Sequence, residues 1–263
     1  GADNTAVGKC AAACNTTGAS NAVFGYNSFC ANTTGSNNTA IGEDSLKSNT
    51  TAANNTAVGS DASRKNTTGA QNTAVGGGSF ACNTTGSNNT AIGQAALESN
   101  TTGGSNTAVG RKTFENVTTG SANVAIGICA GSDASMINIT TESNRFVAGH
   151  NDITNAYVKV DWTVTSDLRD KTEIGDVPVG LQFVNKLKPV SFRFKKSREN
   201  PEPHGFKKYG FLAQDILELE GSNNVIIDNE NDENLKVTNS HLIPVLVNAI
   251  KELKAEIDEL KKK

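Results

Sequence analysis

Hydrophobic and polar positions in the N-terminal half recur at a fixed interval of 17 residues. The motif Asn-Thr-Ala-Val/Ile-Gly, with small variations, ends at eight evenly spaced glycines: Gly8, Gly25, Gly42, Gly59, Gly76, Gly93, Gly110 and Gly127. A second motif, Asn-Thr-Thr-Gly, follows on the same step, with Ala52 replacing its glycine once. Such a period indicates one structural unit stacked on copies of itself.

Seventeen residues are too few for the helix pairs of common solenoids, and glycine with β-branched residues disfavours helix. Each repeat therefore predicts two short strands separated by two tight turns, as in a β-solenoid or β-roll. Glycine and asparagine at fixed places supply the positive φ angles of the turns. At roughly 4.8 Å per coil, seven or eight coils make a rod about 35 Å long.

Alternation along the first strand points Thr39 and Ile41 to one face and Ala40 to the other. The last copy has Val124 where the others have Thr, so we assign the Thr39 and Ile41 face to the interior. Four places past each motif glycine lies a second, mostly apolar column: Ala12, Phe29, Leu46, Ser63, Phe80, Leu97 and Phe114. The residues one place earlier are small, as tight contact between coils requires.

A 17-residue coil is too thin to bury large side chains well, and the chain is 36% hydrophobic but only 5% aromatic. Side-by-side association of several chains is therefore expected to cover the remaining apolar column. The Asn-Val-Ala-Ile-Gly copy at 123–127 and its relatives resemble the head repeats of trimeric autotransporter adhesins and repeats in phage and viral fibres. The resemblance covers about residues 1–130 and implies parallel trimers, often used for surface attachment.

Other interpretations of the repeats have less support. The Asn-x-Thr sequons follow from the repeat itself. Columns of Thr can form an ice-binding face, but such columns are usually exposed strand positions filled according to β-propensity. Carbohydrate could bind along the rod, yet Tyr26 is isolated and no aromatic platform stands out.

Beyond Gly131 the repeat decays and the composition changes. Strands are expected at 136–139, 145–149 and 156–160, in a neck that ends beside Trp162. An α+β pattern follows Lys171. Its expected elements are a helix at 179–187, a strand at 189–194, a loop at 200–205, a strand at 209–213, a helix at 214–219 and a hairpin of 225–228 with 235–237.

A closing helix is expected from His241 to Lys263, with Ser240 as its N-cap and Pro244 tolerated in its first turn. Its apolar residues form a heptad seam of Ile243, Leu246, Ile250, Leu253, Ile257 and Leu260. This a/d pattern favours a self-associating helix, and Ile at a with Leu at d leans weakly towards two strands. The alternative is an amphipathic helix packed on its own domain.

Ser166 and Lys171 lie five residues apart where the repetitive half gives way to the mixed half. Alone, this spacing is a trivial match, because most such pairs are ordinary surface residues. A Ser hydroxyl becomes a nucleophile only with a base, and Lys serves as one only when burial or nearby positive charge lowers its pKa. Arg169 is placed to help. Asp167 and Asp170 would oppose that effect unless they pair with Arg169 or point elsewhere.

Four motifs, the first of which contains the Ser–Lys pair, look like the C-terminal intramolecular chaperone of endosialidases and phage tail spikes. They are Ser166-Asp167-x-Arg169-x-Lys171, Leu187-Lys188-Pro189-Val190-x-Phe192, Gly210-Phe211-Leu212-Ala213-Gln214-Asp215, and the run from Leu242 to Leu253. The resemblance covers about residues 162–263. It implies a trimer-forming domain that assists folding and then cuts itself before Ser166, with Ser166 and Lys171 as the dyad.

Composition narrows the remaining possibilities. A net charge of −3 gives no sign of nucleic-acid binding, and three scattered His make a metal site unexpected. The five Cys form no Cys-x-x-Cys pair, so we expect small buried side chains in a packed column, with a disulfide such as Cys10–Cys14 as an open alternative. No apolar run of about 18 residues suggests a membrane span. No cofactor is expected, and Gly1 already lies within the repeat pattern, as in a piece of a longer protein.

The sequence therefore predicts a mainly β chain: a trimeric β-solenoid rod at 1–130, a neck at 131–165, and a small α+β chaperone and peptidase domain with a coiled-coil-like helix at 166–263. We expect a homotrimeric viral or phage fibre segment that cuts itself between Thr165 and Ser166. It would be assembled in the host cytoplasm, carried on the virion, and bind a host glycan or protein receptor. The alternative is a non-enzymatic trimeric adhesin.

Overall fold

The computed structural model describes residues 1–133, 137–150, 152–153, 156–159, 164, 166–196, 198–222, 224–230 and 232–263. The chain divides into two compact units, Gly1–Ile153 and Thr154–Lys263. Each unit has its own hydrophobic core. The two are therefore described one after the other.

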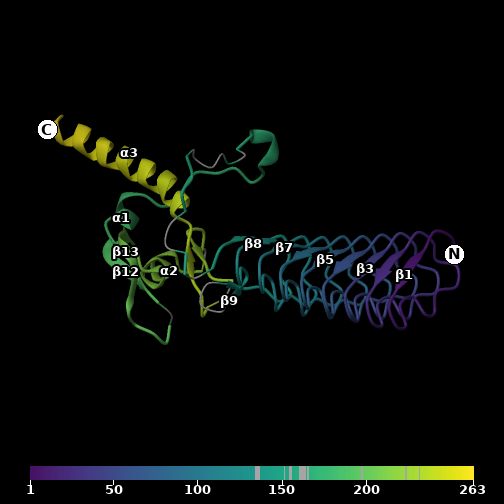
Figure 1. Ribbon diagram of the computed structural model, residues 1–263. Helices are drawn as coiled ribbons and strands as arrows, with labels where there is room; N and C mark the ends of the chain where they lie inside the picture. The colour runs from purple at the N-terminus through teal and green to yellow at the C-terminus, as the bar shows by residue number, and fades with distance from the viewer. Residues whose placement is uncertain are drawn as a thin grey trace. The chain divides into compact units, whose positions relative to one another are not determined.

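The first unit is a β-solenoid, as the 17-residue period predicts. Nine three-residue strands stack in one parallel sheet in the order β1-β2-β3-β4-β5-β6-β7-β8-β11 (Figure 1). Their bounds are β1 Thr5–Val7, β2 Ala22–Phe24, β3 Thr39–Ile41, β4 Thr56–Val58, β5 Thr73–Val75, β6 Thr90–Ile92, β7 Thr107–Val109, β8 Val124–Ile126 and β11 Phe146–Ala148. From β1 to β8 each residue pairs with the residue 17 places on, so the sheet register is the sequence repeat itself.

Each coil has one strand rather than the two expected. The stretch where the second strand was predicted contains left-handed residues on alternate positions, such as Asn27 and Phe29 with φ of 52° and 53°. Backbone bonds still join this side of neighbouring coils, for example from Phe29 N–H to Ser45 O at 2.9 Å and from Ala31 N–H to Lys47 O at 3.0 Å. The coils thus stay hydrogen-bonded without extended chain, because every coil repeats the same turns.

The interior lies on the opposite face of the strand from the one predicted. Ala40 is fully buried whereas Ile41 is 39% exposed, and from β2 to β8 the middle residue of each strand is buried while the third is at least partly exposed. The reason is volume. The predicted second column does point inward, and its Phe29, Leu46, Phe80, Leu97 and Phe114 are all fully buried. The middle residue, Ala in most coils and Val in β2 and β11, fits across a thin coil from these side chains, so the first and third residues are turned outward.

A ladder of buried asparagines joins the coils at the residue before each strand. Asn72 Oδ1 accepts the backbone N–H of Asn89 at 3.0 Å, and its Nδ2 donates to Gly86 O at 2.9 Å. The same backbone contact runs from Asn4 to Asn123 and ends on the N–H of Arg145. A second column stacks side chain on side chain, as in the bond of Asn49 Nδ2 to Asn32 Oδ1 at 3.0 Å. These amides explain why the repeat retains Asn.

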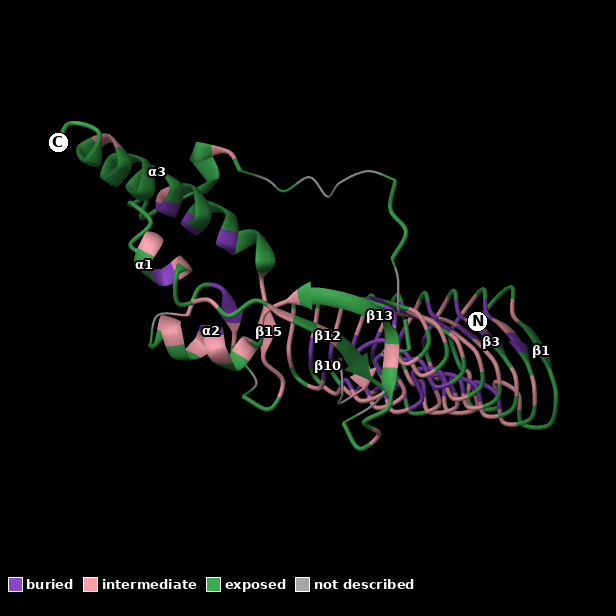
Figure 2. Cartoon of the chain, turned by 90° about the vertical axis from the view of Figure 1, so that its left-hand side faces the viewer, coloured by how far each residue is buried: buried purple, intermediate pink, exposed green. Residues whose placement is uncertain are grey.

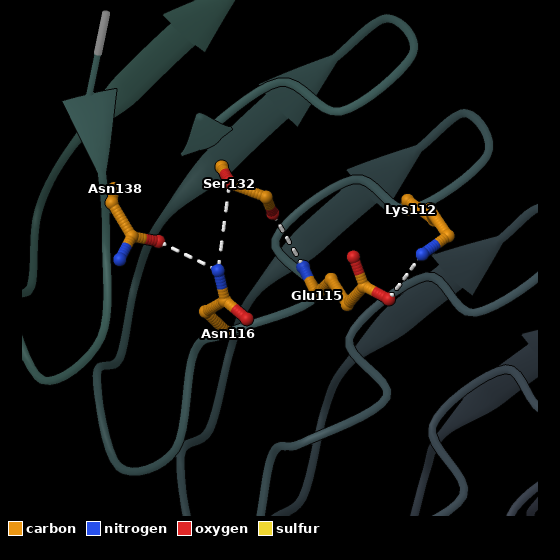
Figure 3. Close-up of polar contacts among 5 residues, drawn as sticks. All are labelled: Lys112, Glu115, Asn116, Ser132 and Asn138. Atoms are coloured by element: carbon orange, nitrogen blue, oxygen red, sulfur yellow. Dashed lines mark hydrogen bonds and ion pairs between the residues drawn. The ribbon is translucent and has the colours of Figure 1, made fainter. Parts of the chain in front are cut away.

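The last coil departs from the period. β8 pairs with β11 at a step of 22 residues, and the extra chain contains a short antiparallel pair, β9 Ser132–Asp133 with β10 Ile137–Asn138. Polar contacts fasten this pair to the preceding coil (Figure 3). Ser132 Oγ accepts from Glu115 N–H at 2.7 Å, and Asn116 Nδ2 donates to Asn138 Oδ1 at 2.8 Å.

The second unit has small paired elements around a separate core. They are the 3-10 helix η1 Leu168–Asp170, α1 Leu181–Val184, the antiparallel pair β12 Val190–Lys195 and β13 Pro203–Gly210, α2 Ala213–Glu220, the hairpin β14 Ile227–Asp228 with β15 Lys236–Val237, η2 Asn239–His241 and α3 Leu242–Leu260. Its core contains Phe183, Ile216, Ile226, Ile227, Leu242 and Val245. The Glu220 carboxylate accepts three consecutive backbone N–H groups at 2.8–3.0 Å, which fixes α2 to the start of the hairpin.

Most elements of this unit were predicted, with three corrections. β13 begins at Pro203, inside the expected loop, because it must match β12 along its length. Residues 156–159 form no strand. Ser240 is not the N-cap of α3: it lies within η2, and the cap residue His241 makes no side-chain capping bond. Trp162 lies outside the described residues.

Helix α3 has apolar residues on two faces. Leu242, Val245 and Ala249 are buried on their own domain. Side chains of the heptad seam are instead exposed, 65% for Ile250 (Figure 2). Packing on the domain and the seam therefore use different residues of the same helix.

Removing one ladder amide should destabilise the rod. Asn72→Ala leaves the N–H of Asn89 without its partner, whereas the carbonyl of Gly86 still accepts from Asn83 Nδ2. A buried unsatisfied group costs about 1–3 kcal/mol, so we expect a loss of that size. Denaturant unfolding followed by circular dichroism measures this loss. The exposed Thr68→Ala in the neighbouring turn is the control, and an equal effect of the two substitutions would contradict the role of the ladder.

Substitution by alanine should affect the melting temperature differently at two adjacent glycines. Gly76 has φ of 130°, and a Cβ there would meet the carbonyl carbon and oxygen of Gly93 at 2.6 Å. Strain alone costs about 1–3 kcal/mol in such a conformation, so Gly76→Ala should lower the melting temperature markedly. A Cβ on Gly77 would have nothing closer than Ser60 O at 3.9 Å, so Gly77→Ala should leave it nearly unchanged.

Candidate self-cleavage site

The side chains of Ser166 and Lys171 are in contact. The Lys171 Nζ lies 2.7 Å from the Ser166 Oγ, within hydrogen-bonding distance. The chain between them forms η1, whose turn is closed by bonds from Asp170 N–H to Asp167 O and from Lys171 N–H to Leu168 O, both 3.2 Å. Five residues of extended chain would separate the two groups widely. The turn is therefore what brings the nucleophile and amine together.

Asp167 forms this turn by capping it. Its Oδ1 accepts the backbone N–H of Arg169 at 2.9 Å, so the carboxylate is the N-cap of η1. The sequence interpretation treated Asp167 only as a charge near the dyad. An Asp two residues before an unpaired N–H is a common turn signal, and it could have revealed this positioning role.

Asp167 and Arg169 also form an ion pair. The Arg169 Nε and Nη2 lie 3.0 and 2.6 Å from the two carboxylate oxygens. This hydrogen bonding holds the pKa of Asp167 below its usual value and raises the pKa of Arg169. The positive charge of Arg169 is therefore matched by Asp167, and the pair adds little net charge beside Lys171. The sequence left open whether Asp167 pairs with Arg169 or points elsewhere. In the structure the two residues are paired.

Ser166 and Lys171 are both exposed in the single chain. As an ammonium, Lys171 donates to Ser166 Oγ, and in that form it cannot accept the hydroxyl proton. General-base chemistry requires the neutral amine, which desolvation favours. The contact has the right partners and distance, and it lacks the burial that a lysine base needs. Thr165, on the other side of the expected cut, lies outside the described residues.

The cysteines occupy a different environment from the one expected. Cys10 and Cys14 are exposed, and Cys30, Cys82 and Cys129 are partly exposed, all as free thiols. They sit on the outer side of the coils rather than in a buried column. Partial burial and the neighbouring Cys14 and Cys10 raise the pKa of the Cys30 thiol.

The described part of the chain contains neither a cluster of metal ligands nor a membrane-spanning helix. No group of three or more His, Cys, Asp or Glu there is arranged to hold a metal ion. Among the same residues, no helix is both long and apolar enough to cross a membrane.

Comparison with known families finds a match within the second unit. Residues 166–225 match the family described as chaperone of endosialidase, a peptidase family. The match begins at Ser166 and includes η1, α1, β12, β13 and α2. No curated protein and no solved structure matches the chain.

The family match and the solenoid lie in different parts of the chain. The matched segment follows a solenoid whose register is fixed by a 17-residue repeat. Residues 166–225 are therefore similar to the chaperone of endosialidase family, and a β-solenoid of 17-residue coils precedes them in this chain.

Proposed function

We propose that the chain is a segment of a trimeric viral or phage fibre or spike. Its C-terminal domain drives trimerisation and folding of the solenoid, and then cuts the chain between Thr165 and Ser166. The observation that carries this proposal is the 2.7 Å contact between Ser166 Oγ and Lys171 Nζ at the first residue of the family match. The fibre is carried on the virion and binds a host-surface glycan or protein.

The cut proceeds as an acyl shift. Lys171, as a neutral amine, takes the proton of Ser166 Oγ while that oxygen attacks the carbonyl carbon of Thr165. The C–N bond breaks, the proton passes to the departing nitrogen, and the chain is held by an ester at Ser166. Water then hydrolyses the ester, leaving a carboxylate on Thr165 and an amino group on Ser166.

Assembly supplies the burial that this chemistry needs. In one chain Lys171 is exposed to water, whereas burial is what favours a neutral amine. Packing of neighbouring chains around η1 removes that water and favours the neutral amine. The cut is therefore tied to association, and a chain that has not assembled keeps its chaperone.

The α3 seam is the surface that gathers the chains. Its exposed Ile and Leu side chains follow a heptad pattern, and the residues that hold the helix on its own domain lie elsewhere on it. Association through the seam costs no intramolecular packing.

Replacing the nucleophile should abolish the cut. The wild-type chain should yield fragments of 165 and 98 residues (263 − 165 = 98) on a denaturing gel, the shorter one beginning at Ser166 by mass spectrometry. Ser166→Ala and Lys171→Ala should both remain at 263 residues, while Ser191→Ala and Lys186→Ala should be cut normally. Fragments from Ser166→Ala, or an intact wild-type chain, would favour the non-enzymatic adhesin instead.

Charging the seam should prevent assembly and thereby the cut. Ile250→Lys places an ammonium at an exposed a position, so the domain should fold, sediment as a monomer and stay uncut. Ala255→Lys adds the same charge on the outer side of α3 and should assemble and cut like the wild type. Sedimentation and a denaturing gel measure the two effects, and a trimeric Ile250→Lys would show that the seam is not the contact.

A further inference from the structure

The outward face of the solenoid strands carries an unbroken apolar column. The third residue of each strand points away from the coil interior: Val7, Phe24, Ile41, Val58, Val75, Ile92, Val109 and Ile126. The most exposed of these leave 39–57% of their surface uncovered. The first residue of each strand, usually Thr, lies beside this column on the same face. We call these two columns the strand face.

Charged side chains avoid the strand face throughout the rod. In seven successive coils an eleven-residue run, which ends at the motif glycine, contains no Asp, Glu, Lys or Arg: 15–25, 32–42, 49–59, 66–76, 83–93, 100–110 and 117–127. The charges fall between these runs, at Glu43, Asp44, Lys47, Asp61, Arg64, Lys65, Glu98, Arg111, Lys112 and Glu115. Proteins normally keep exposed sheet surfaces soluble with charge, so a neutral side implies that something covers it.

The strand face is large enough for a specific interface. Eight coils at about 4.8 Å extend for ~38 Å. A standard interface buries about 800 Å² per partner, which over that length needs a width of ~20 Å. Extended chain rises ~3.3 Å per residue, so about six residues span it. The three-residue strand covers about half of this width at ~3.3 Å per residue, and uncharged residues flank it on both sides in each of the seven coils.

The spacing of the columns selects the partner. Adjacent strands pair residue for residue at every 17-residue step, so the Val/Ile side chains recur at one regular distance along the rod. A surface whose side chains repeat at a different spacing would match one or two coils and then fall out of register. A second copy has the same pitch by construction, and its strand face carries no charge to repel the first.

We propose that copies of this chain associate side by side through the strand face, in parallel and coil against coil. The proposal rests on the trimer proposed above and adds which side of the rod faces its neighbours. Thr and Val/Ile, which a single coil cannot enclose, then lie inside the assembly, while the charged positions remain in water. Val124 and Phe146, at the first strand position where most coils have Thr, extend the apolar surface at the C-terminal end of the sheet.

Site-specific photocross-linking of the full chain tests the face directly. Benzoylphenylalanine in place of Phe24 is a conservative change, because an aromatic side chain already occupies that position of the strand face. The matched control carries it in place of Ala31, in the same coil at the position where the next-but-one coil has Lys65. After irradiation, the Phe24 site should give covalent dimers and trimers on a denaturing gel, and the Ala31 site should give monomers.

Sedimentation of the same samples separates the two proposals. A trimer that cross-links from Ala31 and not from Phe24, or from neither, would overturn the strand face and leave the proposed trimer intact. A monomer would overturn both. A monomer that also halts the growth of ice crystals would assign the Thr-bearing face to ice rather than to a second copy.

Discussion

The rod depends on one constraint: each coil must offer the next coil the same hydrogen-bonding groups at the same positions. The asparagine ladder meets this constraint with side chains, since each amide bonds the backbone of the next coil, and the backbone N–H of the same residue bonds the amide of the coil before. The strand and the left-handed turns meet it with the main chain. A coil has little interior volume, so hydrophobic burial alone would hold it weakly. Repetition of polar contacts compensates, and it explains why the sequence repeats so closely.

The period, the strand position and the turn residues could be predicted because each follows from a local rule. Motif glycines mark places where a Cβ would collide with the next coil. The inward column of Phe and Leu was also predictable, as a large apolar side chain recurring at one place. The interior face of the strand was not. Alternation over three residues is equally compatible with either face, and only the size of the side chain across the coil decides in favour of Ala40.

At the candidate site, the sequence identified the residues but not the hydrogen bonds and ion pair that position them. Ser166 and Lys171 were identified from their surrounding motifs, and nothing in their spacing predicts a 2.7 Å contact without the turn that Asp167 caps. The pairing of Arg169 with Asp167 was one of two open alternatives, because sequence does not specify which carboxylate an arginine reaches. A lysine base also depends on burial, which no single sequence position encodes.

The winding of the rod has a mechanical consequence. Each coil packs 17 residues of chain into one strand spacing, about 4.8 Å of rod length. Drawn out straight, the same residues reach about 56–61 Å. A pull that peels a single coil from the end therefore adds some 50 Å of slack while the remaining coils keep their bonds. A solenoid wound in this way yields to tension in steps, one coil at a time, instead of breaking at once.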